Sequence, residues 1–279
     1  MARKEIAPNR PKLAVFTLCQ KGGVGKTTWC RGYLDIARAA GLTVAAFDAD
    51  GETGQLVQYY GTRTNGVIDR VQNPIRGVSD FNIRRERDRD MLVNASELEA
   101  DVILFDLPGG SVQELAEISG DGRLVFETYR AAGFQVVVVI VITHMVAAVR
   151  TVLDSIDAFG DTARYVVVKN EGFAEPDEFV TFEGFADANG ALRYGKARQA
   201  IDQVGGEVIH MPKLAASTYA KLDVDSIGYS SAISERRLFP ADRLRVHVWL
   251  EKFRKSLAGT VLDPVSASVP AVESTGAVA

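Results

Sequence analysis

A glycine-rich segment near the start of the chain, Gln20 to Thr28, combines residue types that bind phosphate. It reads QKGGVGKTT, after an apolar run and before a stretch of helical character. Glycines let the backbone curl so that successive N–H groups point at one anion, and the following helix adds its positive N-terminal end. In such a loop the lysine reaches the β- and γ-phosphates, and the next hydroxyl coordinates Mg²⁺. We therefore expect these roles for Lys26 and Thr27. The other expected nucleotide-binding residues of the loop are Gly22, Gly23, Val24, Gly25 and Thr28.

Three aspartates follow apolar runs farther along the chain. Asp48 and Asp50 lie in FDADGETG, and Asp106 lies in VILFDLPGG. The first two are two positions apart, so they share one face at the end of an extended strand. Ligands of open α/β sheets bind beyond the carboxyl ends of the strands, so we expect these carboxylates to surround the phosphate loop. Asp106 would hold a Mg²⁺-bound water. The alternative for Asp48 and Asp50 is the capping of a turn.

The elements that must position these residues alternate between short β-rich runs and helical stretches. This pattern predicts an α/β fold, with a doubly wound, mostly parallel sheet and helices on both faces. Strands are expected at 13–18, 43–48, 101–106, 134–143, 164–170 and 207–211. Helices are expected at 27–40, 112–130, 146–159, 195–204 and 240–257.

The 279 residues suit one domain, expected to span 12–259 after an N-terminal extension at 1–11. Residues 260–279 contain small residues, two prolines and no lysine or arginine, which predicts a disordered tail. Two stretches interrupt the alternating pattern. Residues 61–90, with the charge cluster RRERDRD, are expected to form a surface excursion, and 171–190 an acidic insertion.

Composition excludes several classes of protein. The net charge of −4 gives no global reason to expect a polyanionic partner. Two cysteines make neither a disulfide framework nor a zinc or iron–sulfur pattern. The first residues lack the apolar core of a secretory signal, and the longest apolar run, 136–142, is too short to span a bilayer. We therefore expect a cytoplasmic protein that does not associate with membranes.

The phosphate loop departs from the common pattern at one position and carries a second lysine. Gln20 stands where the first glycine is usual, and Lys21 is an additional lysine. The run KGGVGKT resembles the loop of the deviant Walker-A ATPases of the ParA/MinD family. With the glutamine that precedes it, the loop sequence is most similar to that of the ParA branch. The resemblance implies a P-loop NTPase fold with ATP and Mg²⁺ as cofactors. It further implies a homodimer in which Lys21 crosses to the partner's ATP, in the manner of an arginine finger, whereas Lys26 serves its own.

The same resemblance implies roles for the remaining candidates. Asp50 would position or activate the attacking water and, with Lys21 and Lys26, make up the catalytic residues. Thr27, Asp48 and Asp106 would form the metal site. Asn170 would hydrogen-bond the adenine, because an amide offers both a donor and an acceptor, and Pro212 would pack a loop against the base. The chain differs from the family after Asp50, where GETG replaces the usual Pro-Gln-Gly.

The segment 235–257 is basic, with seven lysines and arginines against three acidic residues. Its apolar positions follow helical spacing, so the basic residues are expected to face solvent. Such a surface permits non-specific DNA binding through phosphate contacts, and the resemblance implies DNA binding by the ATP-bound dimer. The alternative is a solvated helix face. The residues expected at this surface are Arg236, Arg237, Arg243, Arg245, Arg254 and Lys255.

Together these features predict a ParA-like ATPase of plasmid or chromosome partition, associated with the nucleoid, hydrolysing ATP slowly and stimulated by a separate adaptor or activator protein. One alternative is a conjugative-transfer or other positioning ATPase that acts on a protein partner instead of DNA. Less favoured are a metabolic synthetase of the same superfamily, which often lacks Lys21, and a redox ATPase, which would need cysteine pairs. A tyrosine kinase would need a tyrosine-rich tail, and the last tyrosine is Tyr229. A binding module without hydrolysis also remains open.

Overall fold

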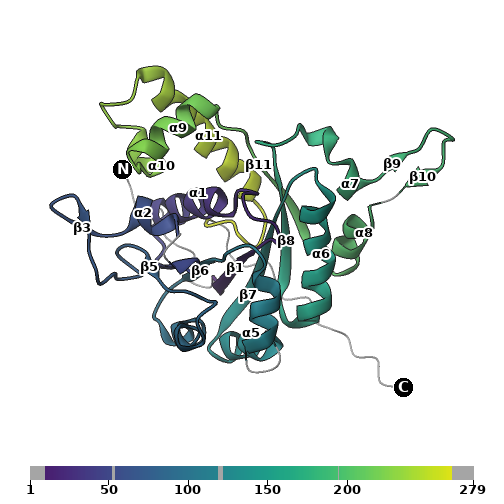
Figure 1. Ribbon diagram of the computed structural model, residues 1–279, viewed down its shortest axis with the longest axis horizontal. Helices are drawn as coiled ribbons and strands as arrows, with labels where there is room; N and C mark the ends of the chain where they lie inside the picture. Colours follow the sequence, from purple (N-terminus) through teal and green to yellow (C-terminus); the bar gives the residue numbers. More distant parts are fainter. Residues whose placement is uncertain (1–9, 52–53, 119–121, 194, 266–279) are drawn as a thin grey trace.

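A seven-stranded parallel sheet forms the centre of the computed structural model, which describes residues 10–51, 54–118, 122–193 and 195–265 (Figure 1). The strand order is β11-β8-β7-β1-β6-β2-β5. The chain thus winds from β1 toward one edge of the sheet and then toward the other, which confirms the doubly wound α/β fold. The strands are β1 (Lys12–Leu18), β2 (Val44–Asp48), β5 (Ser79–Asp80), β6 (Val102–Asp106), β7 (Phe134–Ile142), β8 (Arg164–Asn170) and β11 (Glu207–Met211).

Helices cover both faces of the sheet, and successive strand residues feed two separate cores. Leu13 and Val15 of β1 belong to one core, and Ala14 and Phe16 belong to the other. The first core is covered by α1 (Lys26–Ala39), α2 (Leu56–Tyr60), α9 (Ala216–Val224), α10 (Tyr229–Ala232) and α11 (Pro240–Leu257). The second is covered by α3 (Asp90–Asn94), α4 (Ser111–Glu117), α5 (Gly122–Ala131), α6 (Val146–Phe159), α7 (Val180–Glu183) and α8 (Lys196–Gln203).

Three stacked phenylalanines help to set the register of the central strands. Phe16, Phe105 and Phe47 lie side by side on β1, β6 and β2, with neighbouring ring centroids 5.0 Å apart. All three are almost fully buried, and each buried ring contributes about 1.5–3 kcal/mol of transfer free energy. Because the rings align, the residues that follow align as well. Asp48 is the register partner of Asp106 at the carboxyl edge of the sheet.

The expected strands agree with β1, β2, β6, β7, β8 and β11, and the expected helices at 146–159 and 240–257 coincide with α6 and α11. The single helix expected at 112–130 is wrong. α4 ends at Glu117, Ile118 has extended backbone angles, and α5 begins at Gly122. A Cβ on Gly122 would lie 2.9 Å from the backbone of Leu115 and Ala116. The glycine therefore permits two helices to meet where the helical pattern suggested one.

The stretch 61–90 is more than a surface excursion. It holds the small hairpin β3 (Arg63–Thr64) and β4 (Val67–Ile68), and then β5, which pairs with the edge of β2. Val78 and Ile83 are fully buried. The backbone of Phe81 donates to Asp48, so this segment continues the sheet past the end of β2 and reaches the region of the predicted site.

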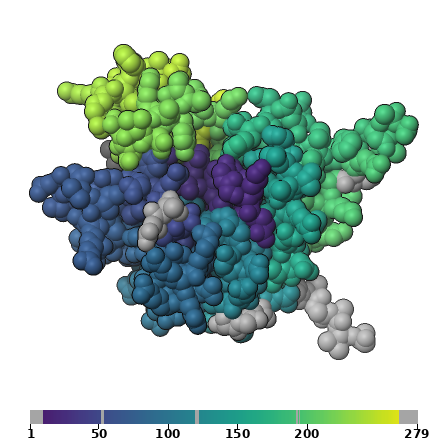
Figure 2. Space-filling view, in the orientation of Figure 1, coloured from purple at the N-terminus to yellow at the C-terminus, as the bar shows by residue number. Residues whose placement is uncertain are grey.

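The insertion extends away from the body of the protein, and packing continues beyond the expected end of the domain. Beyond α7 the insertion forms the hairpin β9 (Phe185–Ala186) and β10 (Leu192–Arg193), which projects from the body on the right of Figures 1 and 2. Leu262, expected in the tail, is fully buried in a core, so ordered packing continues past 259. Residues 1–9 and 266–279 lie outside the described residues. Within the described part of the chain, no helix has the length and apolar character needed to cross a membrane.

Candidate functional site

The loop between β1 and α1 has the backbone geometry of an anion-binding turn. Gly23 and Gly25 have φ angles of 74° and 99°, a region that favours glycine. At Gly25 the packing also excludes a side chain, because a Cβ would lie 2.4 Å from Nδ2 of Asn170. The backbone N–H of Trp29 bonds to the carbonyl of Gly25, so α1 starts directly from the loop. The positive end of α1 therefore faces the space above the loop.

That space is a cavity of about 380 Å³ at the carboxyl edge of the sheet. In Figure 2 the purple N-terminal segment, which contains the loop, reaches the surface between the blue and the green parts of the chain. The cavity brings together nine of the expected site residues. It is lined by Gly22, Gly23, Gly25, Lys26, Thr27, Thr28, Asp48, Asp50, Gln55, Asp106, Leu107, Pro108, Gly109 and Tyr219.

Asp106 lies at the base of the cavity, close to the start of α1. Burial, the largest cause, raises the pKa of this carboxyl to about 6, while the hydroxyl of Thr27 and the charge of Lys26 act in the opposite direction. Lys26 is itself only 8% exposed. The hydroxyl of Thr27, the ammonium of Lys26 and the carboxylate of Asp106 therefore lie close together in the cavity.

Asp48 sits beside Asp106 and is equally buried. Burial, followed by the charge of Asp106, raises the pKa of Asp48 to about 7. Its carboxylate accepts hydrogen bonds from the backbone N–H groups of Val57 (3.1 Å) and Asp50 (3.3 Å), so it also anchors the start of α2. A Cβ on Gly54 would lie 2.4 Å from this carboxylate. Gly54 is therefore required at the end of the segment GETG; Glu52 and Thr53 lie outside the described residues.

The donor set at this point fits a magnesium ion. The Thr27 hydroxyl and the Asp106 and Asp48 carboxylates are hard oxygen ligands, and a divalent cation would relieve the mutual repulsion of the two buried carboxylates. The described residues include no cluster of three or more His, Cys, Asp or Glu side chains able to hold a metal alone. Such a site suits Mg²⁺, which keeps water and substrate phosphate oxygens among its ligands.

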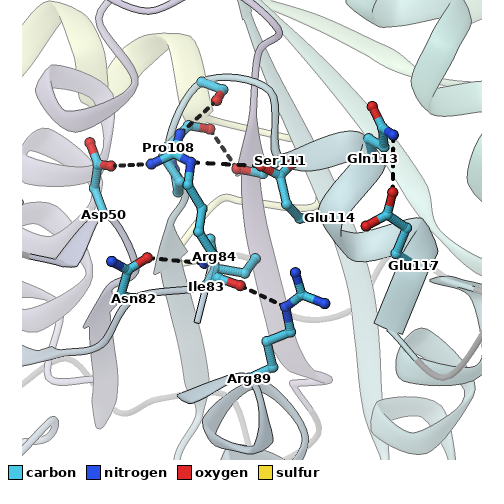
Figure 3. A network of polar contacts seen from close by, with 11 residues as sticks. Asp50, Asn82, Ile83, Arg84, Arg89, Pro108, Ser111, Gln113, Glu114 and Glu117 are labelled. Carbon is cyan, nitrogen blue, oxygen red and sulfur yellow. Dashed lines mark hydrogen bonds and ion pairs between the residues drawn. The ribbon is translucent and has the colours of Figure 1, made fainter. Parts of the chain in front are cut away.

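Asp50 is held by an arginine that sequence reasoning did not connect with the site. Nη1 of Arg84 lies 3.1 Å from Oδ1 of Asp50, and its Nη2 donates to the carbonyl of Gly109 at 3.1 Å (Figure 3). Arg84 belongs to the RRERDRD cluster expected at the surface. The local sequence gives no sign of this contact, because the pairing of 79–83 with the end of β2 creates it.

Lys21 lies outside the cavity walls. Its ammonium donates to Sδ of Met145 at 3.1 Å, in an exposed position at the start of α6. Lys26, by contrast, lines the cavity. The two lysines of one loop therefore point to different places, and only Lys26 faces the cavity of its own chain.

Asn170 braces the phosphate loop. Its Nδ2 donates to the carbonyl of Val24 at 2.8 Å, and its Oδ1 accepts from the N–H of Gly172 at 2.9 Å. The carbonyl of Pro212 accepts a hydrogen bond from Nε1 of Trp249 at 2.5 Å. Among the described residues that were expected to bind nucleotide, Val24, Asn170 and Pro212 do not line the cavity. A contact of Asn170 or Pro212 with adenine stays a prediction.

Tyr219 is a cavity residue that sequence reasoning missed, because the pattern of α9 was too weak to predict that helix. Its hydroxyl lies 3.2 Å from Oγ1 of Thr28 and accepts from Nη1 of Arg31 at 3.3 Å. Arg31 is fully buried, with its guanidinium 3.4 Å from the ring centre of Tyr59. A cation held by aromatic rings thus orients a phenol that reaches the phosphate loop.

The basic residues expected at a DNA surface are mostly engaged within the chain. Arg237 pairs with Glu235 and Asp225, Arg245 with Asp242, and Arg254 with Glu251. Arg243 was expected to face solvent, but it is half-buried and donates to the carbonyl of Glu235. Arg236 and Lys255 are exposed as expected.

No protein-family model matches the chain, and no curated protein matches it. Solved structures to which it is similar include a ParA family ATPase from Chlorobium tepidum, at 13% identity, 87% of this chain and 98% of that chain covered, and a TM-score of 0.48. MinD from Aquifex aeolicus is 19% identical, over 86% of this chain and 95% of that chain, with a TM-score of 0.42. A Cyanothece McdA variant in complex with ATP is 12% identical, over 94% of this chain and 100% of that chain, with a TM-score of 0.44.

Proposed function

We propose that this chain is an ATPase that binds ATP and Mg²⁺ in the 380 Å³ cavity and hydrolyses the γ-phosphate bond slowly. One observation carries the proposal: Lys26, Thr27, Asp48 and Asp106 converge on a glycine-rich anion-binding loop at the carboxyl edge of a parallel sheet. Sheets of this kind bind nucleotides at that edge. Mg²⁺, held by Thr27 and Asp106, would neutralise charge that develops on the phosphates.

The chain's own residues account for binding and for the orientation of the reactants. The loop N–H groups and the Lys26 ammonium neutralise the β- and γ-phosphates. Thr27 and Asp106 hold the cation, and Asp48 fixes α2 at the cavity wall while adding charge beside it. Asp50, on the open side of the cavity, accepts a proton or a hydrogen bond from the attacking water.

The position of Lys21 supports an ATP-bound homodimer. Its ammonium is exposed beside Met145 and is directed away from the chain's own cavity. A partner docked face to face would receive this charge on its nucleotide, where a cation stabilises the transition state. ATP would then complete two composite sites at once, and hydrolysis would separate the subunits.

The finer proposal is a ParA-like cycle in which the ATP dimer binds DNA non-specifically and an adaptor protein stimulates hydrolysis. The exposed Arg236 and Lys255 at the ends of the basic segment support phosphate contacts. In the dimer each such residue is present twice. This doubling would make DNA binding depend on ATP.

A protein partner is the second candidate, and two observations favour it. The ion pairs on α11 leave fewer cations for DNA than the sequence suggests. On the opposite face, α6, α7 and α8 border an open hollow of about 820 Å³ whose walls include the apolar side chains of Val146, Val149 and Leu153. A positioning ATPase that acts on a protein would use such a surface.

Nucleotide chemistry is tested first, with ATP binding and phosphate release measured for the wild type. Asp50→Ala is expected to keep ATP affinity and to lose most turnover, because the proposed role of Asp50 toward the nucleotide is to position the attacking water. Asp177→Ala, an exposed aspartate of the insertion, is the matched control and should behave as wild type. Turnover equal to wild type in Asp50→Ala would contradict the role of Asp50. Absence of ATP binding in the wild type would contradict the proposed function.

DNA binding is then measured on random-sequence duplex with ATP, with ADP and without nucleotide, at two salt concentrations. Binding that requires ATP, weakens with salt and fails in Lys21→Ala supports the partition reading. The double variant Arg236→Ala/Lys255→Ala should reduce affinity and the salt dependence together. Arg130→Ala, on α5 at the other face of the sheet, is the control. ATP-driven dimers that bind no DNA would favour the protein partner.

A further inference from the structure

We propose that Arg84 is a positioning residue for ATP hydrolysis, which fixes Asp50 to the loop after β6 and so holds the water-positioning carboxylate over the phosphate loop. The inference rests on the proposed ATPase function. It is based on the guanidinium of Arg84, which contacts two residues of the cavity wall, Asp50 and Gly109. Arg84 itself is not among the described residues that line the cavity.

The backbone brings Arg84 to this position through an extension of the sheet. Phe81 donates to Asp48, Gly51 donates to Phe81, and Ile83 donates to Ala49, so 81–83 runs alongside 48–51. Asp50 and Asn82 form an isolated antiparallel bridge. The side chain of Asn82 then accepts a hydrogen bond from the N–H of Arg84 at 3.0 Å. The Cα of Arg84 is therefore fixed relative to Asp50 before the side chains meet.

The guanidinium uses its geometry fully. Nη1 contacts Oδ1 of Asp50 at 3.1 Å, Nη2 donates to the carbonyl of Gly109 at 3.1 Å, and Nε lies 3.7 Å from Oε1 of Glu114 (Figure 3). A planar fork of donors can hydrogen-bond two acceptors at once and bring its charge near a third group, whereas an ammonium acts as a single point charge. The site therefore selects arginine over lysine.

The loop that Arg84 grips is itself locked to the phosphate loop. A Cβ on Gly109 would lie 3.0 Å from the backbone nitrogen of Gly22, and the N–H of Gly110 bonds to the carbonyl of Cys19 at 3.1 Å. Through its hydrogen bond to Gly109, Arg84 thus fixes the position of the Asp50 carboxylate relative to the loop that would bind the γ-phosphate. A displacement of about 1 Å at a reacting group costs on the order of 100-fold in rate.

Stability alone does not explain this arrangement. The side chains of Arg84 and Asp50 are 49% and 37% exposed, and exposed ion pairs contribute on the order of 0–1 kcal/mol to folding. Loss of Arg84 should therefore leave the folded state nearly intact, while the Asp50 carboxylate loses the contact that links it to the loop after β6.

The test compares Arg84→Ala, Arg84→Lys and the control Arg87→Ala in the full chain. Arg87 belongs to the same charge cluster, but its side chain is 79% exposed. For each protein the ATP dissociation constant, kcat, KM and melting temperature are measured. For Arg84→Ala we expect kcat to fall about 10- to 100-fold, with KM, ATP affinity and melting temperature close to wild type. Arg84→Lys should recover only part of kcat, and Arg87→Ala should match wild type.

Other outcomes overturn the inference in distinguishable ways. An unchanged kcat in Arg84→Ala would remove the positioning role, and an increased kcat would show that Arg84 restrains Asp50 instead. A loss of ATP affinity equal to the loss of turnover would make Arg84 a binding residue. Full recovery in Arg84→Lys would reduce the role to charge alone. A wild type that binds ATP without turning it over would overturn the ATPase function first, and the inference with it.

Discussion

Asp48 and Asp106 end neighbouring parallel strands as register partners, and both carboxylates are buried at the base of the cavity. Burial raises the pKa of Asp48 to about 7, with the charge of Asp106 as the next cause, and burial raises the pKa of Asp106 to about 6. The pair therefore resists ionisation in the nucleotide-free protein. A bound cation would relieve the repulsion between the two ionised carboxylates. In the nucleotide-free protein the same repulsion lowers the free energy of unfolding.

Asp106→Asn should make the nucleotide-free protein more stable at pH 7.5. Between about pH 4 and pH 7 the folded state binds more protons at this pair than the unfolded state, so its contribution to stability falls as pH rises through that window. The neutral amide removes one of the two charges. We expect a melting temperature several degrees higher at pH 7.5 and a smaller difference at pH 5, measured by thermal denaturation in EDTA.

The same variant should lose the stabilisation that Mg²⁺ and ATP give to the wild type, because that stabilisation is set by affinity. Asp157→Asn, an aspartate of α6 away from the cavity, serves as control. A lower melting temperature for Asp106→Asn at pH 7.5 in EDTA would show that its hydrogen bonds with the loop outweigh the charge penalty.

Asn170→Ala tests whether Asn170 supports the phosphate loop or contacts the adenine base. The substitution leaves the Val24 carbonyl and the Gly172 N–H without this partner, at a cost of about 1–3 kcal/mol for a buried group. If Asn170 braces the loop, affinity for ATP and for GTP falls by the same factor. If it contacts adenine, the preference for ATP over GTP is lost. We expect the equal loss, measured by titration of both nucleotides, with the exposed Asn189→Ala unchanged.

The sequence predicted those parts of the site that adjoin a strand of strong pattern. Lys26, Asp48 and Asp106 each follow a buried apolar strand, so the parallel fold alone brings them to one edge. Arg84 could not be placed in this way, because its position depends on β5, a strand of two residues without a pattern of its own. The sequence also did not predict the direction in which the Asn170 amide points. The end of β8 places that residue at the site, but the choice between base and backbone is made by packing.

Tyr219 illustrates the same limit on the other side of the loop. α9 has little separation of polar and apolar faces, and only Thr218 and Leu222 of it are buried. Nothing in the local sequence indicates that its tyrosine, Tyr219, turns toward Thr28. Distant contacts fix it, above all the cation of Arg31, which is held among aromatic rings from α2, α9 and α10.

Tyr219→Phe should weaken ATP binding severalfold while leaving the fold intact. The lost hydroxyl contacts Oγ1 of Thr28 beside the cavity and Nη1 of Arg31, and loss of the hydrogen bond to the charged Arg31 lowers stability by about 1.5–3 kcal/mol. The matched control is Tyr165→Phe, whose hydroxyl donates to the carbonyl of Gly160 at 2.6 Å in the other core. Both variants should lose some melting temperature, and only Tyr219→Phe should lose ATP affinity. Equal ATP affinities, measured by calorimetry, would contradict a role at the nucleotide.

Lys21 and Lys26 offer the sharpest test of composite sites, because one faces away from the cavity and the other lines it. Lys26→Ala should lose ATP binding as a monomer, whereas Lys21→Ala should bind ATP and fail to associate or turn it over. Mixing the two inactive proteins is then decisive. In a mixed dimer the nucleotide on the Lys21→Ala subunit would receive Lys21 from the Lys26→Ala subunit, so turnover should reappear on mixing and rise with total concentration. A mixture as inactive as its components would place Lys21 in its own subunit's chemistry or outside catalysis altogether.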